Sequence, residues 1–225
     1  MAEVSKRIRA IAERISYPTL ADIGTDHGLL PIYALSSGLV CFAVASDVGP
    51  LEQARANAKG VGGIDIRHGD GLSTICAGEA ETIVLAGMGG RLIIDILRES
   101  IDVTLAAKQL LLSPQAGLPD VRRYVHSLGA YIADEEIIED GCMLYTIMDV
   151  RMGALIHEAY SEEDYELGVY RKPYELFLLQ AQNKKRHYEN ILRQMAHHAT
   201  QSEANKERAR EIRSKLDMYN MYALT

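Results

Sequence analysis

The sequence contains neither a long apolar segment nor a secretion signal. Its longest apolar runs, at residues 39–45 and 83–86, are far shorter than the roughly 20 residues that a helix needs to cross a bilayer. The first residues, Met-Ala-Glu-Val-Ser-Lys-Arg, lack the apolar stretch of a signal peptide. We therefore expect a cytoplasmic protein without a membrane anchor.

Cysteine is scarce as well. The three cysteines, Cys41, Cys76 and Cys142, lie far apart and form no Cys-x-x-Cys pair. Two of them fall in apolar, strand-like stretches, so we expect buried free thiols rather than disulfides or a zinc site. We expect no bound metal.

What the chain does contain is enough apolar sequence for a folded core. Of its 225 residues 48% are hydrophobic, which suits one α/β domain of about 150 residues and a smaller appendage. The net charge of −7 is unevenly distributed. Residues 1–150 carry 12 Lys/Arg and 20 Asp/Glu, whereas residues 171–225 carry 11 and 6. This asymmetry favours a C-terminal segment that binds a polyanion, although a solvated helical hairpin explains it equally well.

Strand-like and helix-like segments alternate over residues 1–150. Two further strand-like segments, at residues 130–138 and 143–150, flank the turn sequence Glu-Asp-Gly-Cys and predict a β-hairpin. Such alternation predicts a parallel sheet covered on both faces. The added antiparallel hairpin is typical of the Rossmann-like class I methyltransferase fold, an α/β fold, whereas a dinucleotide dehydrogenase more often continues the parallel series. We predict strands at residues 20–23, 40–46, 64–67, 82–86 and 109–112, and helices at residues 3–16, 29–36, 50–59, 91–98 and 119–128.

A different pattern begins at Tyr174. Apolar residues recur at steps of four and three over residues 177–198 and again over residues 209–223, with a polar segment between them. We predict an antiparallel two-helix coiled coil, in which Lys184 and His198 are poor seam residues. The domain boundary is placed between residues 160 and 161, and both a monomer and a dimer formed through the coiled coil are compatible with the pattern.

A glycine-containing turn follows the first predicted strand. It reads Ala21-Asp22-Ile23-Gly24-Thr25-Asp26-His27-Gly28. Gly24 allows a sharp turn and close approach of a ligand, and Gly28 begins the next helix, whose amides attract an anionic or electron-rich group. Asp26 stands where the dinucleotide fingerprint has its middle glycine and would repel a pyrophosphate, which argues against NAD. In S-adenosylmethionine (SAM) enzymes this turn holds the methionyl part of the cofactor, and an acid such as Asp22 engages its ammonium group. A tight turn without a ligand is the alternative.

Two further acids follow the next two predicted strands. Asp47 ends the second strand, where a carboxylate can accept hydrogen bonds from both ribose hydroxyls of a nucleoside cofactor. Asp70 and Gly71 follow the third strand, where the carboxylate can accept from an adenine amino group and glycine keeps the wall thin. Three such elements in this order favour SAM more than any one of them does.

The fourth predicted strand ends in Ala86-Gly87-Met88-Gly89-Gly90, at the catalytic position of this fold. Enzymes that methylate exocyclic amines commonly have Asn/Asp-Pro-Pro-Tyr/Phe here. Small and flexible residues instead leave room for a flat base. We assign Ala86 and Gly87 to the cofactor wall and Met88 to the reaction site, although a core position for Met88 is the more common role of such a residue.

These segments together resemble the bacterial tRNA (adenine-22-N1)-methyltransferase family, TrmK. The resemblance covers nearly the whole chain, but the family usually has Gln-Pro-Asn after the fifth strand and this chain has Ser113-Pro114-Gln115. It implies a Rossmann-like catalytic domain, SAM as methyl donor, and N1 of an adenine in the tRNA D-arm region as target. The segments that carry it are Ser5-Lys6-Arg7-Ile8, the glycine turn with Pro31, Ala86-Gly87-Met88-Gly89-Gly90, Leu112-Ser113-Pro114-Gln115, Glu139-Asp140-Gly141 with Tyr145, and the helical tail.

The chemistry of such a reaction agrees with these residues. N1 of neutral adenine carries an in-plane lone pair, so methyl transfer depends mainly on alignment and needs no strong base. The product is cationic, and a nearby carboxylate would stabilise the developing charge and accept a proton. Asp26 is the candidate and His27 the second, although a structural role for His27 is equally well supported. The target base would have to leave its stack to reach the pocket.

Basic residues that could contact tRNA lie at both ends of the chain. Those of the N-terminal helix are Arg7, Arg9 and Arg14, and those of the helical tail are Lys184, Lys185, Arg186, Arg193, Arg208 and Arg213. Two alternatives remain at this point. The chain could be an NAD-linked oxidoreductase, favoured by the glycine turn and Asp47, or a non-catalytic RNA-binding protein that depends on its coiled coil.

Overall fold

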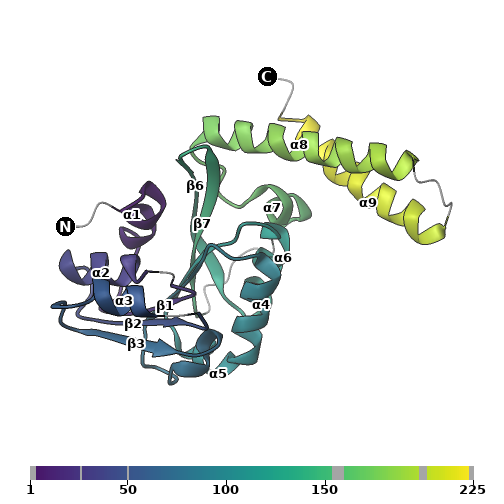
Figure 1. Cartoon of the computed structure of the whole chain (residues 1–225). Helices are drawn as coiled ribbons and strands as arrows, with labels where there is room; N and C mark the ends of the chain where they lie inside the picture. Colours follow the sequence, from purple (N-terminus) through teal and green to yellow (C-terminus); the bar gives the residue numbers. More distant parts are fainter. Residues whose placement is uncertain (1–3, 26, 50, 154–159, 198–201, 223–225) are drawn as a thin grey trace.

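A seven-stranded mixed sheet forms the centre of the computed structural model, which describes residues 4–25, 27–49, 51–153, 160–197 and 202–222 (Figure 1). The strand order is β3-β2-β1-β4-β5-β7-β6. Strands β1 to β5 run parallel, and β7 pairs antiparallel with both β5 and β6. The predicted fold with its terminal antiparallel hairpin is confirmed. The strands are β1 (Thr19–Ile23), β2 (Phe42–Asp47), β3 (Ile64–His68), β4 (Thr82–Ala86), β5 (Gln109–Ser113), β6 (Tyr131–Asp140) and β7 (Met143–Arg151).

Helices cover both faces of the sheet, and a long helical hairpin follows (Figure 1). Helices α1 and α2 pack on one face, while α4 and α6 pack on the other. None of the helices in the described ranges is long and apolar enough to span a bilayer. The helices are α1 (Lys6–Ala12), α2 (Leu29–Ser36), α3 (Glu52–Asn57), the 3-10 helix η1 (Gly71–Thr74), α4 (Gly90–Glu99), α5 (Ile101–Ala106), α6 (Leu118–Ser127), α7 (Glu162–Leu167), α8 (Tyr174–His197) and α9 (Glu203–Asn220).

Alternation along β1 determines which side chains reach which layer. Ala21 and Ile23 belong to the core on the α4–α6 side, and Leu20 belongs to the core on the α1–α2 side. A fully buried side chain of the size of leucine contributes about 1.5–3 kcal/mol, so the two apolar layers fix the register of the strand. Asp22 lies two residues after Leu20, and its carboxylate therefore points to the layer that contains α1.

The β6–β7 hairpin lies between α1 and the helical hairpin. On the α1 side, Arg14 forms an ion pair with Glu136 and Ile138 packs against the α1–α2 core. On the opposite side, Ile137 packs with the buried Phe177 of α8. The hairpin strands thus contact the flanking helical elements on both sides.

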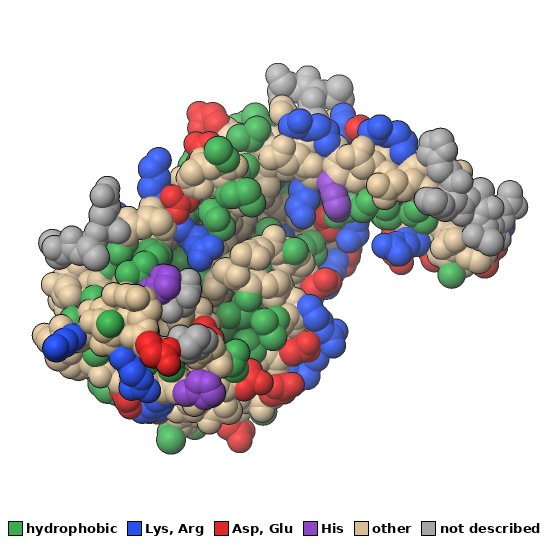
Figure 2. Space-filling model, in the orientation of Figure 1, with side chains coloured by type: hydrophobic (Ala, Val, Ile, Leu, Met, Phe, Trp, Pro, Cys, Tyr) green, Lys and Arg blue, Asp and Glu red, His purple; other side chains and the backbone are tan. Residues whose placement is uncertain are grey.

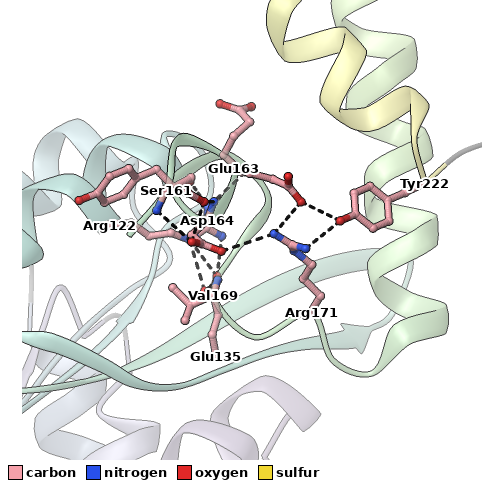
Figure 3. A network of polar contacts seen from close by, with 10 residues as sticks. Arg122, Glu135, Ser161, Glu163, Asp164, Val169, Arg171 and Tyr222 are labelled. Carbon is pink, nitrogen blue, oxygen red and sulfur yellow. Dashed lines mark hydrogen bonds and ion pairs between the residues drawn. The ribbon is translucent and has the colours of Figure 1, made fainter. Parts of the chain in front are cut away.

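A buried ion pair anchors α7 to the sheet domain (Figure 3). Arg122 of α6 and Glu135 of β6 are both 2% exposed, and the guanidinium donates two hydrogen bonds to the carboxylate. The same guanidinium donates to the carbonyl oxygen of Tyr165 at 2.6 Å, and the amide of Val169 donates to Glu135 at 3.2 Å. Buried charges are tolerated only when they are paired and hydrogen-bonded in this way.

Glu166 of α7 extends this polar network to the helical hairpin. Its buried carboxylate accepts hydrogen bonds from the hydroxyls of Tyr188 and Tyr219 at 2.6 and 3.2 Å and pairs with Lys215 at 3.2 Å. Arg171 adds a link to the C-terminal region, because it donates to the Tyr222 hydroxyl at 2.8 Å (Figure 3). Both helices of the hairpin are therefore held by α7.

Several details differ from the sequence predictions. All three cysteines are free, but Cys41, Cys76 and Cys142 are exposed, so their predicted burial is wrong. They lie before β2, after η1 and in the β6–β7 turn, outside the strands. The first helix is shorter than predicted, and the pattern of the sequence does not predict α5 and α7. Pro50 and His198 lie outside the described residues, as do most of the residues between α8 and α9.

Candidate functional site

The glycine turn after β1 lies at the carboxyl edge of the sheet. The strand order reverses between β1 and β4, and ligands of open α/β sheets bind at such a switch point. Gly24 has a φ of +77°, and its amide donates to the carbonyl oxygen of Ser46 at 2.8 Å. A Cβ at this position would lie 2.7 Å from the Cε of Met88. The backbone conformation therefore favours glycine at this position, and an added Cβ would also displace the flexible end of the Met88 side chain.

A pocket of about 230 Å³ opens beside this turn. Its wall contains five residues that the sequence analysis assigned to three roles, namely tRNA binding, cofactor binding and catalysis. Arg7 of α1 lies there beside members of the glycine turn and Ala86 at the end of β4. The proposed site residues in its wall are Arg7, Asp22, Gly24, His27 and Ala86. Thr25, Ile8, Ile11, Leu29 and Leu30 complete the wall.

Asp22 is the buried acid of this pocket, with 7% of its surface exposed. Burial raises its pKa to about 6, while a hydrogen bond with Thr25 and the charge of Arg7 oppose that rise. The negative charge of Asp47 raises the pKa further. A cationic group placed in this pocket would be attracted to both carboxylates.

The other two acids follow at the same edge. Asp47 ends β2, and its carboxylate accepts a hydrogen bond from the Gly49 amide at 2.7 Å. The Gly69 amide donates to the Asp47 carbonyl at 3.0 Å, which places the exposed Asp70 on the next connection. Gly71 packs closely, since a Cβ there would lie 3.1 Å from Ile96. The carboxyl ends of three adjacent parallel strands thus present Asp22, Asp47 and Asp70 in the predicted order.

Ala86, the last residue of β4, lines the pocket, and the loop that follows it is held by backbone hydrogen bonds. The Gly87 amide donates to the Ser113 carbonyl at 3.2 Å, and the Gln115 amide donates to the Met88 carbonyl at 2.9 Å. Gly90 is fixed by packing, because a Cβ there would lie 2.5 Å from the Ala116 carbonyl oxygen. The loop therefore contains one thioether side chain and no titratable group.

The structure describes one of the two acid–base candidates of the glycine turn. Asp26 lies outside the described residues. His27 is an exposed residue of the pocket wall, and its carbonyl oxygen accepts a hydrogen bond from the Asn57 amide at 3.0 Å. Gly28 caps α2 with a φ of +67°, and a Cβ there would contact Ala54 at 3.5 Å.

A second cavity of about 460 Å³ lies between the sheet domain and α8. It is bordered by Gln115, by the β6–β7 turn and by the polar face of α8, including Lys184 and His187. Figure 2 shows the surface hollowed between the body of the protein and the hairpin, and Lys and Arg side chains gather along the hairpin. Because the backbone amide of Gln115 is hydrogen-bonded to the carbonyl oxygen of Met88, this cavity adjoins the loop after β4.

The basic candidates differ in their surroundings. Arg14 is paired with Glu136, and burial lowers the pKa of the Lys184 ammonium, which faces Glu166. Lys185 is half-buried, and Arg9 is exposed on α1. Exposed arginines of the hairpin are Arg186, Arg193, Arg208 and Arg213.

Two residues of this region were not assigned by sequence reasoning. Thr25 forms a hydrogen bond with Asp22. Its position in the sequence between the proposed residues Gly24 and Asp26 could have indicated it as a site residue. Tyr145 of β7 lies beneath the Arg7 guanidinium, whose carbon is 4.7 Å from the ring centroid. No local pattern indicates this interaction, because the two residues are far apart in the sequence.

Comparisons with known proteins agree with this geometry. A family model described as a methyltransferase domain matches residues 4–148. The tRNA (adenine(22)-N(1))-methyltransferase of Bacillus subtilis (strain 168) is 29% identical over 228 residues, which cover 96% of this chain and 95% of that protein. The crystal structure of the B. subtilis m1A22 tRNA methyltransferase TrmK is 28% identical with a TM-score of 0.88, covering 99% of this chain and 100% of that one. The structure of Streptococcus pneumoniae Sp1610 in complex with S-adenosyl-L-methionine is 26% identical with a TM-score of 0.84, covering 98% of this chain and 100% of that one.

The family model extends over α1, the parallel strands and most of the β6–β7 hairpin, which are the elements that build the pocket. The antiparallel β7 between β5 and β6 also distinguishes this sheet from the all-parallel sheet of dinucleotide dehydrogenases. It follows that this chain belongs to the methyltransferase domain family.

Proposed function

We propose that this protein transfers the methyl group of SAM to N1 of an adenine in tRNA, and that the target is adenine 22. The observation that carries the proposal is the extent of the likeness. The B. subtilis enzyme and its structure align with the sheet domain and with the helical hairpin together, not with the common methyltransferase fold alone. We also propose that the enzyme works in the cytoplasm, where its tRNA substrate is found.

The acids at this edge of the sheet fit SAM by the chemistry of their hydrogen-bond acceptors. Asp22 offers a buried carboxylate to an ammonium group, Asp47 a carboxylate to the ribose hydroxyls, and Asp70 an acceptor to the adenine amino group. Gly24, Gly28, Gly71, Ala86 and Gly87 keep the walls free of bulky side chains. When bound, SAM supplies an electrophilic methyl group.

The residues of the chain then have to align the base and remove water. The loop of Gly87 and Met88 offers an apolar surface without a competing nucleophile. Alignment of this kind accounts for much of the rate enhancement when the nucleophile needs no activation. Asp26 is the proposed carboxylate that stabilises the charge developing on the base and accepts its proton, with His27 as the second candidate.

For tRNA, we propose contacts on both sides of the second cavity. The exposed arginines of the hairpin would bind phosphates of the tRNA backbone. The hairpin belongs to a helical domain, and we place the boundary between it and the catalytic domain between residues 160 and 161. Lys184 contributes its charge to the wall of the cavity, and Lys185 and Arg9 extend the basic surface. Arg14, which is already paired with Glu136, contributes least.

The test is methylation of unmodified tRNA transcripts with labelled SAM, followed by digestion and mass spectrometry of the nucleosides. We expect 1-methyladenosine as product, and no transfer to a matched transcript in which guanine replaces adenine 22. Methylation of that control transcript would contradict the assignment of the position. No transfer to any tRNA by a folded protein that binds SAM would contradict the assignment of the substrate.

A further inference from the structure

Arg7 occupies the point where α1, β7 and the loop after β4 meet. Its backbone amide donates to the Asp140 carboxylate at 3.1 Å, which fixes the start of α1 against the β6–β7 hairpin. Its guanidinium lies over the Tyr145 ring and forms part of the pocket wall. A Cβ on Gly87 would lie 3.1 Å from a terminal nitrogen of Arg7. The side chain is therefore held directly beside the loop at which methyl transfer is proposed.

Several arginines of this protein are paired with a carboxylate, but among the described residues the Arg7 guanidinium is not. Arg14, Arg67, Arg122 and Arg151 are each paired with a carboxylate. In the described part of the chain, Arg7 forms no such ion pair, although it is half-buried and attracted by Asp22. A guanidinium has five N–H donors and a flat face, so a half-buried one beside a pocket is available for a further partner.

The charges around Arg7 decide between a phosphate and a base as that partner. The buried Asp22 lies in the same pocket wall as Arg7, so a phosphate placed beside the guanidinium would be repelled by this carboxylate. A neutral base has no such penalty. Guanidinium planes and aromatic rings are the groups on which proteins stack unpaired bases, and Arg7 already stacks on one such ring.

We propose that Arg7, supported by Tyr145, is the platform on which the target adenine stacks after it has left its position in the RNA. This inference depends on the proposed function and deepens it, because it replaces the phosphate contact expected from the sequence with a contact to the reacting base. Tyr145 is a positioning residue in this arrangement, and Asp140 holds the helix that carries Arg7.

The experiment compares Arg7→Ala, Arg7→Lys, Tyr145→Leu and Tyr145→Phe with the parent. Lys6→Ala is the matched control, because Lys6 is an exposed basic residue of the same helix. For each protein we would measure the thermal midpoint, the affinity for SAM by calorimetry, the affinity for tRNA at several salt concentrations, and the single-turnover rate with both substrates saturating. A tRNA with 2-aminopurine at the target position reports stacking of the base through its fluorescence.

We expect Arg7→Ala, Arg7→Lys and Tyr145→Leu to lower the single-turnover rate by roughly tenfold to a hundredfold, the range that base stacking on a side chain supports. The salt dependence of tRNA binding should remain that of the parent. The bound 2-aminopurine should fluoresce more strongly in these variants, because it stacks less. Tyr145→Phe and Lys6→Ala should retain the parent rate, and Arg7→Ala combined with Tyr145→Leu should be no slower than either alone.

Other outcomes would overturn the inference. A parent-like rate and fluorescence in Arg7→Ala would show that the base does not stack there. Weaker tRNA binding with a smaller salt slope and an unchanged saturated rate would assign Arg7 to a phosphate, and a loss confined to SAM affinity would assign it to the cofactor. If the parent itself methylates no adenine in tRNA, the proposed function fails and the inference fails with it, whereas an active parent with an unaffected Arg7→Ala refutes the inference alone.

Discussion

Asp22 illustrates how a binding residue can weaken the fold that contains it. Burial raises its pKa to about 6, so the folded protein holds this proton more tightly than the unfolded chain, in which the value is near 3.8. Between these two pH values the folded state binds more protons than the unfolded state. The free energy of unfolding contributed by Asp22 therefore falls as the pH rises from about 4 to about 6 and stays low above that.

The variant Asp22→Asn should accordingly be more stable than the parent at neutral pH. We expect a gain of about 1–3 kcal/mol at pH 7.5, because the amide avoids the burial of a charge, and a much smaller difference near pH 4. The same variant should lose affinity for SAM, and parent affinity should decline as the pH falls through about 6. Urea unfolding and calorimetry at both pH values measure these effects. Asp217→Asn, an exposed site on α9, is the control, and a variant that is less stable than the parent at pH 7.5 would contradict the argument.

Asp47 permits a simpler test at the same scale. Among the described residues, its side chain is hydrogen-bonded only to the backbone of its own turn, so Asp47→Ala should leave the fold intact. Loss of charge-assisted hydrogen bonds to the ribose should reduce SAM affinity by about 1–3 kcal/mol. Calorimetry against Asp102→Ala, an exposed acid of α5, checks this, and parent-like affinity would remove Asp47 from the site.

At the scale of the elements, the junction of the loop after β4 with α4 depends on one glycine. Gly90 faces the backbone carbonyls of Ala116 and Gly117, which a Cβ would approach to 2.5 and 2.9 Å. The adjacent Gly89, by contrast, has no described atom within 4 Å of such a Cβ and has an ordinary φ of −68°.

We therefore expect Gly90→Ala to cost about 1–3 kcal/mol of unfolding free energy, because carbonyl oxygens cannot rotate away as a side chain can. Gly89→Ala should cost less than about 1 kcal/mol, the difference between glycine and alanine at a helix N-cap. Denaturant unfolding of the two variants measures the contrast. Equal losses would show that α4 and the loop before α6 can separate at little cost.

The elements that the sequence predicted correctly share a physical cause. Parallel strands buried on both faces are short and apolar, and they stand out from polar connections, as in β4 and β5. α7 was missed because its six residues are mostly acidic, and its structure depends on the capping box of Ser161 and Asp164 and on the buried Arg122. Periodicity cannot reveal a helix that is held mainly by polar contacts with distant residues.

The residues of the site also fall into those that the sequence could predict and those that it could not. Asp22, Asp47 and Asp70 could be predicted because the ends of adjacent parallel strands always share an edge of the sheet. The place of Arg7 in the pocket could not, since it depends on how α1 packs against β6 and on the contact of Arg7 with Tyr145 of β7, more than a hundred residues later in the chain. The predicted burial of the cysteines failed because Cys41, Cys76 and Cys142 lie outside the strands, in connections that reach solvent.

For the whole molecule, the relation between the sheet domain and the helical hairpin decides how tRNA is approached. Phe177 and Tyr219 pack with Ile137 and Leu167, so removal of the hairpin would expose an apolar surface of the sheet domain. Lys184 faces Glu166, and a glutamate at that position would place two carboxylates together. The basic surface is therefore better tested at arginines whose side chains are exposed.

We expect the double change Arg186→Glu and Arg193→Glu to weaken tRNA binding without altering SAM affinity. Both side chains are exposed and, among the described residues, hydrogen-bonded only to neutral partners within α8, so the packing of the hairpin should persist. If each arginine neutralises one phosphate, the log–log salt slope should decrease in magnitude by about 1 for each arginine replaced. Arg91→Glu is the control, because it reverses an exposed arginine of α4, at which no tRNA binding is proposed.

Filter binding over a range of salt concentrations, with sedimentation to record the oligomeric state, distinguishes a tRNA-binding role of the hairpin from a role in assembly. An unchanged slope together with an altered oligomeric state would identify the hairpin as an assembly element, because arginines that neutralise phosphates cannot be replaced without a change in the number of released counterions.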